Sequence, residues 1–169
     1  MTSIRKISSK GLAFAIVASL AGASFAVQAA NTGDLTVTAT VASTCDFVTS
    51  APVAFGSAVP NQNTDNQGSV NWNCTNTTTA TVYLDGGGNN DVNNRLMSGD
   101  TTSGTLGYQL YTTAGRTTVW TDAVGVGITG TGYTPAGTSL AVFGRVLAGG
   151  FANAVPDTYT DTVLVTITL

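Results

Sequence analysis

Residues 34–43 read Asp-Leu-Thr-Val-Thr-Ala-Thr-Val-Ala-Ser, just ahead of Cys45. Apolar side chains alternate with threonines at Leu35, Val37, Ala39 and Val41, which is the two-residue period of a strand with one apolar face. A short strand is not stable alone in water. Its apolar face must therefore lie against a sheet, either of the same molecule or of a neighbouring one, and which of the two it is decides the function.

The first 29 residues have the features of an export signal. Basic residues are followed by the apolar run 12–20, and small residues then lead to Val27-Gln28-Ala29. This order is typical of a signal peptide, for which we predict cleavage after Ala29. A membrane anchor is the weaker interpretation, because the apolar run is short and glycine and serine interrupt its end.

The chain that remains after cleavage is acidic and lacks common catalytic side chains. It keeps three arginines against nine aspartates, a formal net charge of −6, and has no lysine, glutamate or histidine. Without a basic patch it has nothing to hold phosphates, so we expect no nucleic-acid partner. Hydrolytic triads need a base beside the nucleophile, and scattered aspartates are typical of turns on a solvated surface. We therefore expect no enzymatic activity and no cofactor.

Two cysteines, Cys45 and Cys74, remain in the exported chain. An even pair in an exported protein is most simply a disulfide. It would close a loop of about 30 residues, which the chain-entropy treatment values at roughly 3.5 kcal/mol. A metal site is the weaker alternative, since neither histidine nor a C-x-x-C pair is present to complete it.

The rest of the chain predicts an all-β sandwich in one domain. Short alternating runs are separated by Gly, Asn, Pro and Asp, and no segment shows a convincing helical period. We expect loops at 59–68 and 125–137, and a hairpin that joins 106–111 to 117–120. The predicted strands are 34–43, 52–56, 69–74, 80–85, 106–111, 117–120, 140–146 and 159–169.

Two patterns that could bind ligands have simpler interpretations. The segment Asp85–Asp91 is similar to a calcium loop, but Gly87 and Leu96 occupy ligand positions of the EF-hand pattern. A turn is the better account, and we expect no metal site. Trp72, Trp120 and the tyrosines could line a sugar-binding face, but aromatic residues in strands are more often part of the core.

Several motifs follow one another along the chain after the signal peptide. The most specific is the C-terminal run Tyr159-Thr160-Asp161-Thr162-Val163-Leu164-Val165-Thr166-Ile167. The others are Gly33–Val37 with Ser43-Thr44-Cys45, Val53-Ala54-Phe55-Gly56, Ser69–Cys74, Val82–Gly87, Gly107–Tyr111 and Val142–Val146. In this order the motifs resemble those of the spore coat protein U domain family, the subunits of archaic chaperone–usher pili, and the resemblance covers the whole chain after the signal peptide.

This resemblance implies an immunoglobulin-like β-sandwich that lacks its last strand and has a groove beside its C-terminal strand. A periplasmic chaperone would lend a strand during transit, and at the outer-membrane usher the next subunit's N-terminal segment would replace it. This is donor-strand complementation, a form of strand addition. We thus expect a signal peptide at 1–29, a donor segment at 30–44 and the sandwich domain at 45–169.

The implied function is that of a structural pilin or surface-coat subunit that polymerises head to tail and supports adhesion and biofilm formation. The subunit would pass through the periplasm to the cell surface, with identical or related subunits, a chaperone and an usher as partners. Leu35, Val37, Ala39 and Val41 would fill a groove lined in part by Val163, Val165, Ile167 and Leu169. The first rival hypothesis is a monomeric secreted sandwich that inserts its own N-terminal strand and binds carbohydrate. The second is a secreted enzyme that uses its aspartates.

Overall fold

A computed structural model describes residues 30–169, so the predicted signal peptide at 1–29 lies outside the described residues. The chain divides into two units, Met1–Ala39 and Thr40–Leu169. Within the described residues the only helical element is the three-residue η1 (Gly87–Asn89), and no helix there could cross a membrane.

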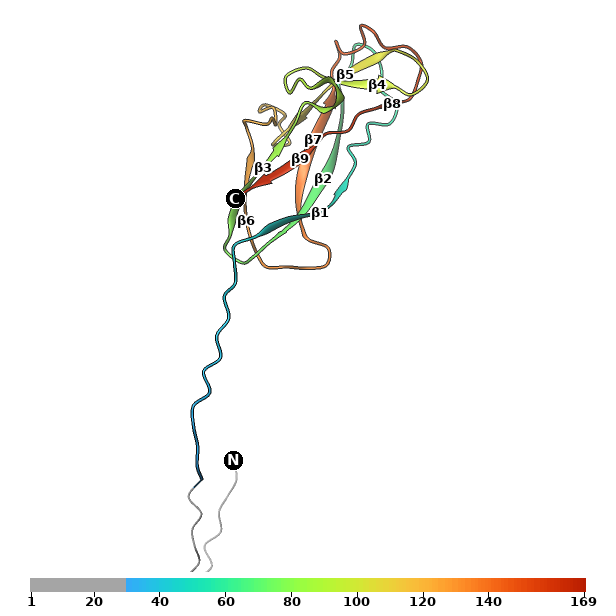
Figure 1. Ribbon diagram of the computed structural model, residues 1–169. Coiled ribbons are helices and arrows are strands. Elements are labelled where there is room, and N and C mark those ends of the chain that lie inside the picture. Colours follow the sequence, from blue (N-terminus) through green and yellow to red (C-terminus); the bar gives the residue numbers. More distant parts are fainter. Residues whose placement is uncertain (1–29) are drawn as a thin grey trace, which may run out of the picture. The chain divides into compact units, whose positions relative to one another are not determined.

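The domain consists of two antiparallel sheets (Figure 1). The larger has the order β1-β2-β7-β5-β4-β8 and the smaller has the order β6-β3-β9. The strands of the larger sheet are β1 (Cys45–Ala51), β2 (Thr64–Cys74), β7 (Thr138–Val146), β5 (Thr105–Tyr111), β4 (Arg95–Gly99) and β8 (Tyr159–Thr160). Those of the smaller sheet are β6 (Val126–Thr129), β3 (Thr79–Leu84) and β9 (Val165–Thr168). The prediction of an all-β sandwich is confirmed.

The core lies between the sheets and follows the two-residue period of the strands. In β3 the side chains of Ala80, Val82 and Leu84 are buried, while the residues between them are half-buried or exposed. Trp72 and Trp120 are buried as well, which confirms that these aromatic residues belong to the core. The predicted disulfide is present and joins Cys45 to Cys74, which are paired directly across β1 and β2.

Two local predictions are wrong around β2. Residues 52–56 are not a strand, because Pro52 has no N–H to donate and the chain leaves the ladder at Ala51. A β-carbon at Gly68 of β2 would lie 2.4 Å from the Ala51 oxygen, so only a glycine lets the chain cross there. Conversely, residues 64–68 belong to β2 rather than to a loop, since β7 supplies their ladder partners from Thr64 onward.

The predicted hairpin from 106 to 120 is confirmed only near its turn, where the Thr112 amide donates to Thr118 O at 3.1 Å. Along its length β5 pairs with β4, which the sequence did not predict, and with β7. Residues 117–120 contribute one isolated bridge, and the chain then passes between the sheets. There the Trp120 amide donates to Leu110 O at 2.9 Å, and the indole Nε1 donates to Val82 O at 2.9 Å. The loop predicted at 125–137 contains β6.

Candidate strand-binding groove

The two sheets each have an open edge on the same side of the domain. β9 pairs with β3, and no strand among residues 30–169 pairs with its other edge; β1 pairs only with β2. β1 also contacts β9, so the two open edges are neighbours. An open edge presents unpaired N–H and C=O groups and is a template for a further strand.

An apolar groove of about 420 Å³ lies between these edges. One wall is formed by the end of β1 and by Pro52 and Val53, and the other by residues 159–163 and Val165. The floor consists of apolar side chains of both sheets, namely Val70, Leu84, Met97, Leu110 and Val142. The groove therefore reaches down to side chains of the core, each of which is itself buried.

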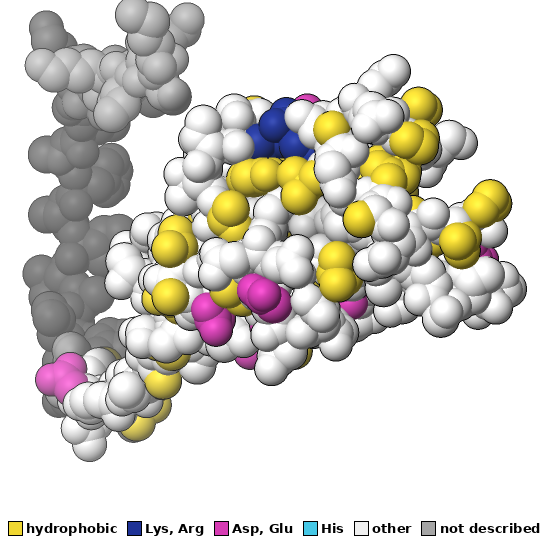
Figure 2. Space-filling view, turned by 90° about the horizontal axis from the view of Figure 1, so that it is seen from above, with side chains coloured by type: hydrophobic (Ala, Val, Ile, Leu, Met, Phe, Trp, Pro, Cys, Tyr) yellow, Lys and Arg dark blue, Asp and Glu magenta, His cyan; other side chains and the backbone are white. Residues whose placement is uncertain are grey.

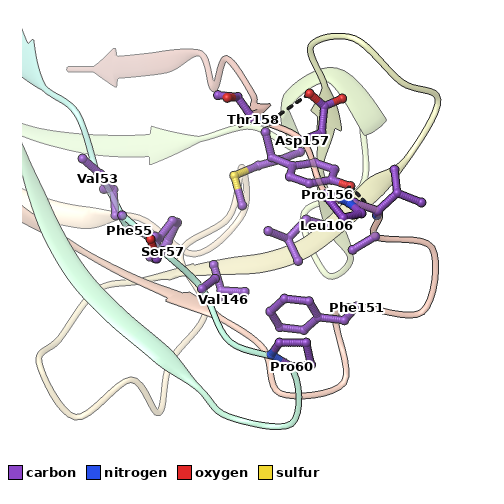
Figure 3. A pocket seen from close by; sticks show the side chains of 17 residues that line it. Val53, Phe55, Ser57, Pro60, Leu106, Val146, Phe151, Pro156, Asp157 and Thr158 are labelled. Atoms are coloured by element: carbon purple, nitrogen blue, oxygen red, sulfur yellow. Dashed lines mark hydrogen bonds between the residues drawn. The ribbon is translucent and has the colours of Figure 1, made fainter.

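A second hollow of about 700 Å³ adjoins the groove, and the two share Val53, Phe55, Met97 and Tyr159. Figure 3 shows Leu106 and Val146 in its floor, Val53 and Phe55 to one side, and Phe151 with Pro60 at one end. Figure 2 shows hydrophobic side chains gathered around hollows on one face of the molecule. The two adjoining hollows form one long depression.

The segment 52–56 shapes this depression by lying across β7. A β-carbon at Gly144 would lie 2.4 Å from Val53 Cγ1 and 2.8 Å from Phe55 Cζ. Val53 and Phe55 therefore pack in the space that a side chain at position 144 would occupy. The Phe55 ring then meets the Tyr108 ring edge-on, with centroids 6.4 Å apart.

The sequence-predicted site residues occupy different positions. Val163 and Val165 line the groove, Ile167 packs against the core, and Leu169 is 65% exposed and lines a different hollow. The predicted donor residues belong to residues 30–44, which form neither helix nor strand. The side chains of Leu35, Val37 and Val41 are 87, 83 and 82% exposed, and Ala39 is exposed as well.

Two aspartates to which the sequence predicted no such role hold the wall of the groove at residues 161–164. Asp161 Oδ2 accepts a hydrogen bond from the Tyr108 hydroxyl at 2.5 Å, and its Oδ1 accepts from the Gly88 amide at 2.8 Å. Asp85 Oδ1 accepts from the Leu164 amide at 2.8 Å and from the Gly87 amide at 2.9 Å. Both carboxylates therefore tie this wall to the turn after β3.

Beneath this wall lies Arg95, which is completely buried. Its guanidinium donates to Trp120 O at 2.8 Å, to Asp85 O at 2.9 Å and to Gln109 Oε1 at 2.7 Å. The sequence offers one indication of this buried arginine. Arg95 is one of three arginines after residue 29, and the apolar residues Leu96 and Met97 follow it directly. Arg95 joins β4, the end of β3 and the segment before β6, and so fixes the floor against the wall.

Burial changes the pKa values of this cluster in the expected directions. It lowers the pKa of the Arg95 guanidinium, although nearby Tyr108 and Asp85 oppose the change. Burial also raises the pKa of the Tyr108 hydroxyl, and the hydrogen bond to the Asp161 carboxylate raises it further. Tyr108 is therefore a neutral hydrogen-bond donor at physiological pH.

Comparison with known proteins bears on this open-edged sandwich. The model of the Spore Coat Protein U domain family matches residues 31–166. The chain belongs to this family. No curated protein matches the chain. The match includes eight of the ten residues 159–168, the segment that forms β8, the wall of the groove and β9.

One solved structure similar to this spore coat U domain is the "CsuC-CsuE chaperone-tip adhesion subunit pre-assembly complex from archaic chaperone-usher Csu pili of Acinetobacter baumannii". The similarity has a TM-score of 0.51 at 20% sequence identity and covers 77% of this chain and 40% of that chain. The chain thus spans less than half of the length of the chain it matches. At this identity the likeness shows the fold, an immunoglobulin-like β-sandwich.

Proposed function

We propose that this chain is a structural subunit of a surface fibre assembled by a chaperone–usher pathway. The observation that carries the proposal is the apolar groove between the open edges of β1 and β9, in a chain that also has an exposed alternating segment at 34–43. In the assembled fibre, residues 34–43 of one copy lie in the groove of the next copy and extend the sheet beyond β9.

The chemistry of the segment and of the groove is complementary. Apolar side chains on one face of the segment would lie against the apolar floor of the groove, and backbone groups would complete the ladder on β9. Burying Leu35, Val37 and Val41 contributes about 1.5–3 kcal/mol each, and Ala39 contributes less. The threonines between them would face outward.

The proposal includes transit partners. The Acinetobacter baumannii structure contains a chaperone bound to a pilus subunit, and an open apolar edge is an aggregation hazard until it is covered. We propose that a periplasmic chaperone covers the groove of this chain before an outer-membrane usher exchanges it for residues 34–43. The fibre then supports adhesion and biofilm formation at the cell surface.

The test is the mass of the mature chain, measured by light scattering and on unboiled gels, beside a form that lacks residues 30–43. We expect a ladder of whole-number multiples of the subunit that collapses on heating and is lost in the truncated form. A matched pair refines the test, because Val37→Asp places a charge on the apolar face and Thr38→Asp on the opposite face. Only Val37→Asp should abolish the ladder.

Two outcomes would contradict strand donation between copies. One is a monomer from the intact chain, purified without a co-bound chaperone, which would favour the self-inserted binding module. The other is equal loss of the ladder in Val37→Asp and Thr38→Asp, which would mean that the segment does not bind through its apolar face.

A further inference from the structure

The outer face of the smaller sheet has a composition unlike that of the rest of the surface. The outward positions are Thr79, Thr81 and Tyr83 on β3, Thr166 and Thr168 on β9, and Gly127 and Thr129 on β6. Thr81 pairs with Thr168, Tyr83 with Thr166 and Thr79 with Thr129. None of the nine aspartates or the three arginines of residues 30–169 lies in these three strands. The outer face of the larger sheet, by contrast, has the Asp65–Arg145 ion pair.

A hollow of about 450 Å³ lies on this threonine face. Its lining includes Tyr83, Gly127, Thr168 and Leu169 together with the threonines of β3 and β6. Its volume is within the range of small-molecule sites.

Two glycines make room for this hollow, Gly125 directly before β6 and Gly127 within it. A β-carbon at Gly125 would lie 2.7 Å from Tyr83 Cε1, so the tyrosine ring edge occupies the space where that side chain would be. A β-carbon at Gly127 would meet nothing within 4 Å. The outward side of this segment thus accommodates the ring at one glycine and leaves open space beside it at the other.

Among the described residues, the hydroxyl groups of this face have no hydrogen-bond partner. Within residues 30–169, other threonines such as Thr75, Thr102 and Thr121 hydrogen-bond through their side chains. The side chains of Thr79, Thr81, Thr129, Thr166, Thr168 and Tyr83 make no such bond there. Each hydroxyl can both donate and accept.

We propose that this hollow, which we term the Tyr83 site, binds a neutral hexose polysaccharide. Hydroxyl groups of a sugar match the free threonine hydroxyls, which act as donors and acceptors. The apolar face of a pyranose ring can lie against the half-exposed tyrosine. A neutral chain is favoured over an anionic one, because the protein has a net charge of −6 after the signal peptide and no cation lies on this face.

The Tyr83 site is a proposal separate from the fibre function, but fibre formation would increase the strength of binding. If strand donation extends the sheet beyond β9, Thr36, Thr38 and Thr40 of the donor lie on the same side as Thr166 and Thr168. Each subunit would then repeat the site along the fibre, and a weak contact per subunit would become strong through multivalency.

The test is native electrophoresis of the mature chain, which is acidic and migrates to the anode, in gels that contain dextran, yeast mannan or hydroxyethyl cellulose. We expect retardation by at least one of these polymers. Gly127→Val fills the open space without a clash and should raise the dissociation constant at least tenfold. Gly149→Val is the matched control, because a β-carbon there also meets nothing within 4 Å, and it should bind like the unmodified chain.

Other outcomes would overturn the Tyr83 site. One is that none of the three polymers retards the chain, and another is that Gly127→Val is retarded as much as the unmodified chain. A third is that the unmodified chain migrates slowly even without polymer and Gly127→Val migrates faster, which would mean that the face binds another copy of the chain. The unboiled ladder of the same samples separates this proposal from the fibre function. A ladder without retardation contradicts only the site, and retardation without a ladder contradicts only the fibre.

Discussion

Replacement of Arg95 by methionine tests whether the buried guanidinium holds the groove together. The change keeps a long side chain but removes the donors to Trp120 O and Gln109 Oε1, both buried bonds, and to Asp85 O. Each buried acceptor left without a donor costs about 1–3 kcal/mol. Relief of the charge's desolvation offsets part of this cost. The expected net loss is about 2–4 kcal/mol in the free energy of unfolding, a large share of the 5–15 kcal/mol of a typical domain.

The assay is urea unfolding of the purified mature chain with its disulfide intact. Both tryptophans are buried, Trp72 at 4% and Trp120 at 0% exposure, so their emission should shift to longer wavelength on unfolding. Arg145→Met is the control, because it removes a surface pair with Asp65 in which Arg145 is 27% and Asp65 37% exposed. Such a pair contributes about 0–1 kcal/mol. If the two variants lose the same free energy within about 1 kcal/mol, the account of Arg95 as the centre of the network is wrong.

Two further predictions concern the disulfide and the pH dependence. The double variant Cys45→Ser/Cys74→Ser should lose about 3.5 kcal/mol of unfolding free energy in the same urea assay, and an unchanged midpoint would contradict this. The pKa of Tyr108 is raised in the folded state. The hydroxyl therefore makes its full contribution to stability below its unfolded pKa of about 10, and this contribution is lost as the pH rises from there toward the folded pKa. Stability measured from pH 8 to 11 should therefore fall less steeply in Tyr108→Phe than in the unmodified chain, and equal slopes would exclude this role.

Predictions from the sequence were correct where the two-residue alternation coincided with apolar side chains that face the core. Alternation in 80–85 and 140–146 identified β3 and β7 to within two residues. The cysteine count predicted the disulfide. The polar composition of 64–68 led to the wrong prediction of a loop. A strand whose outward side chains are Asp65 and Gln67 cannot be distinguished from a loop by sequence, because its hydrogen-bond partners come from the distant β7.

Part of the groove could also be predicted. The apolar alternation of 163–167 predicted its wall, and Val163 and Val165 do line it. The second wall and the Arg95 network could not be predicted. Val53 and Phe55 enter the groove only because Gly144, about 90 residues later, leaves space for them. Arg95 is satisfied by the carbonyl groups of Asp85, Val92 and Trp120, which lie in three separate segments.

The sequence by itself determined the all-β class, the disulfide and a segment with one apolar face, because these depend on local period and on residue counts. Only the tertiary structure decided which strands pair and which edges stay open, since pairing depends on partners that are distant in sequence. It also placed the threonines of three strands on one uncharged face and left the space beside Tyr83 unfilled. Both the groove and the Tyr83 site arise from side chains that are absent, at Gly144 and Gly127, and the consequence of a missing side chain appears only once its neighbours are in place.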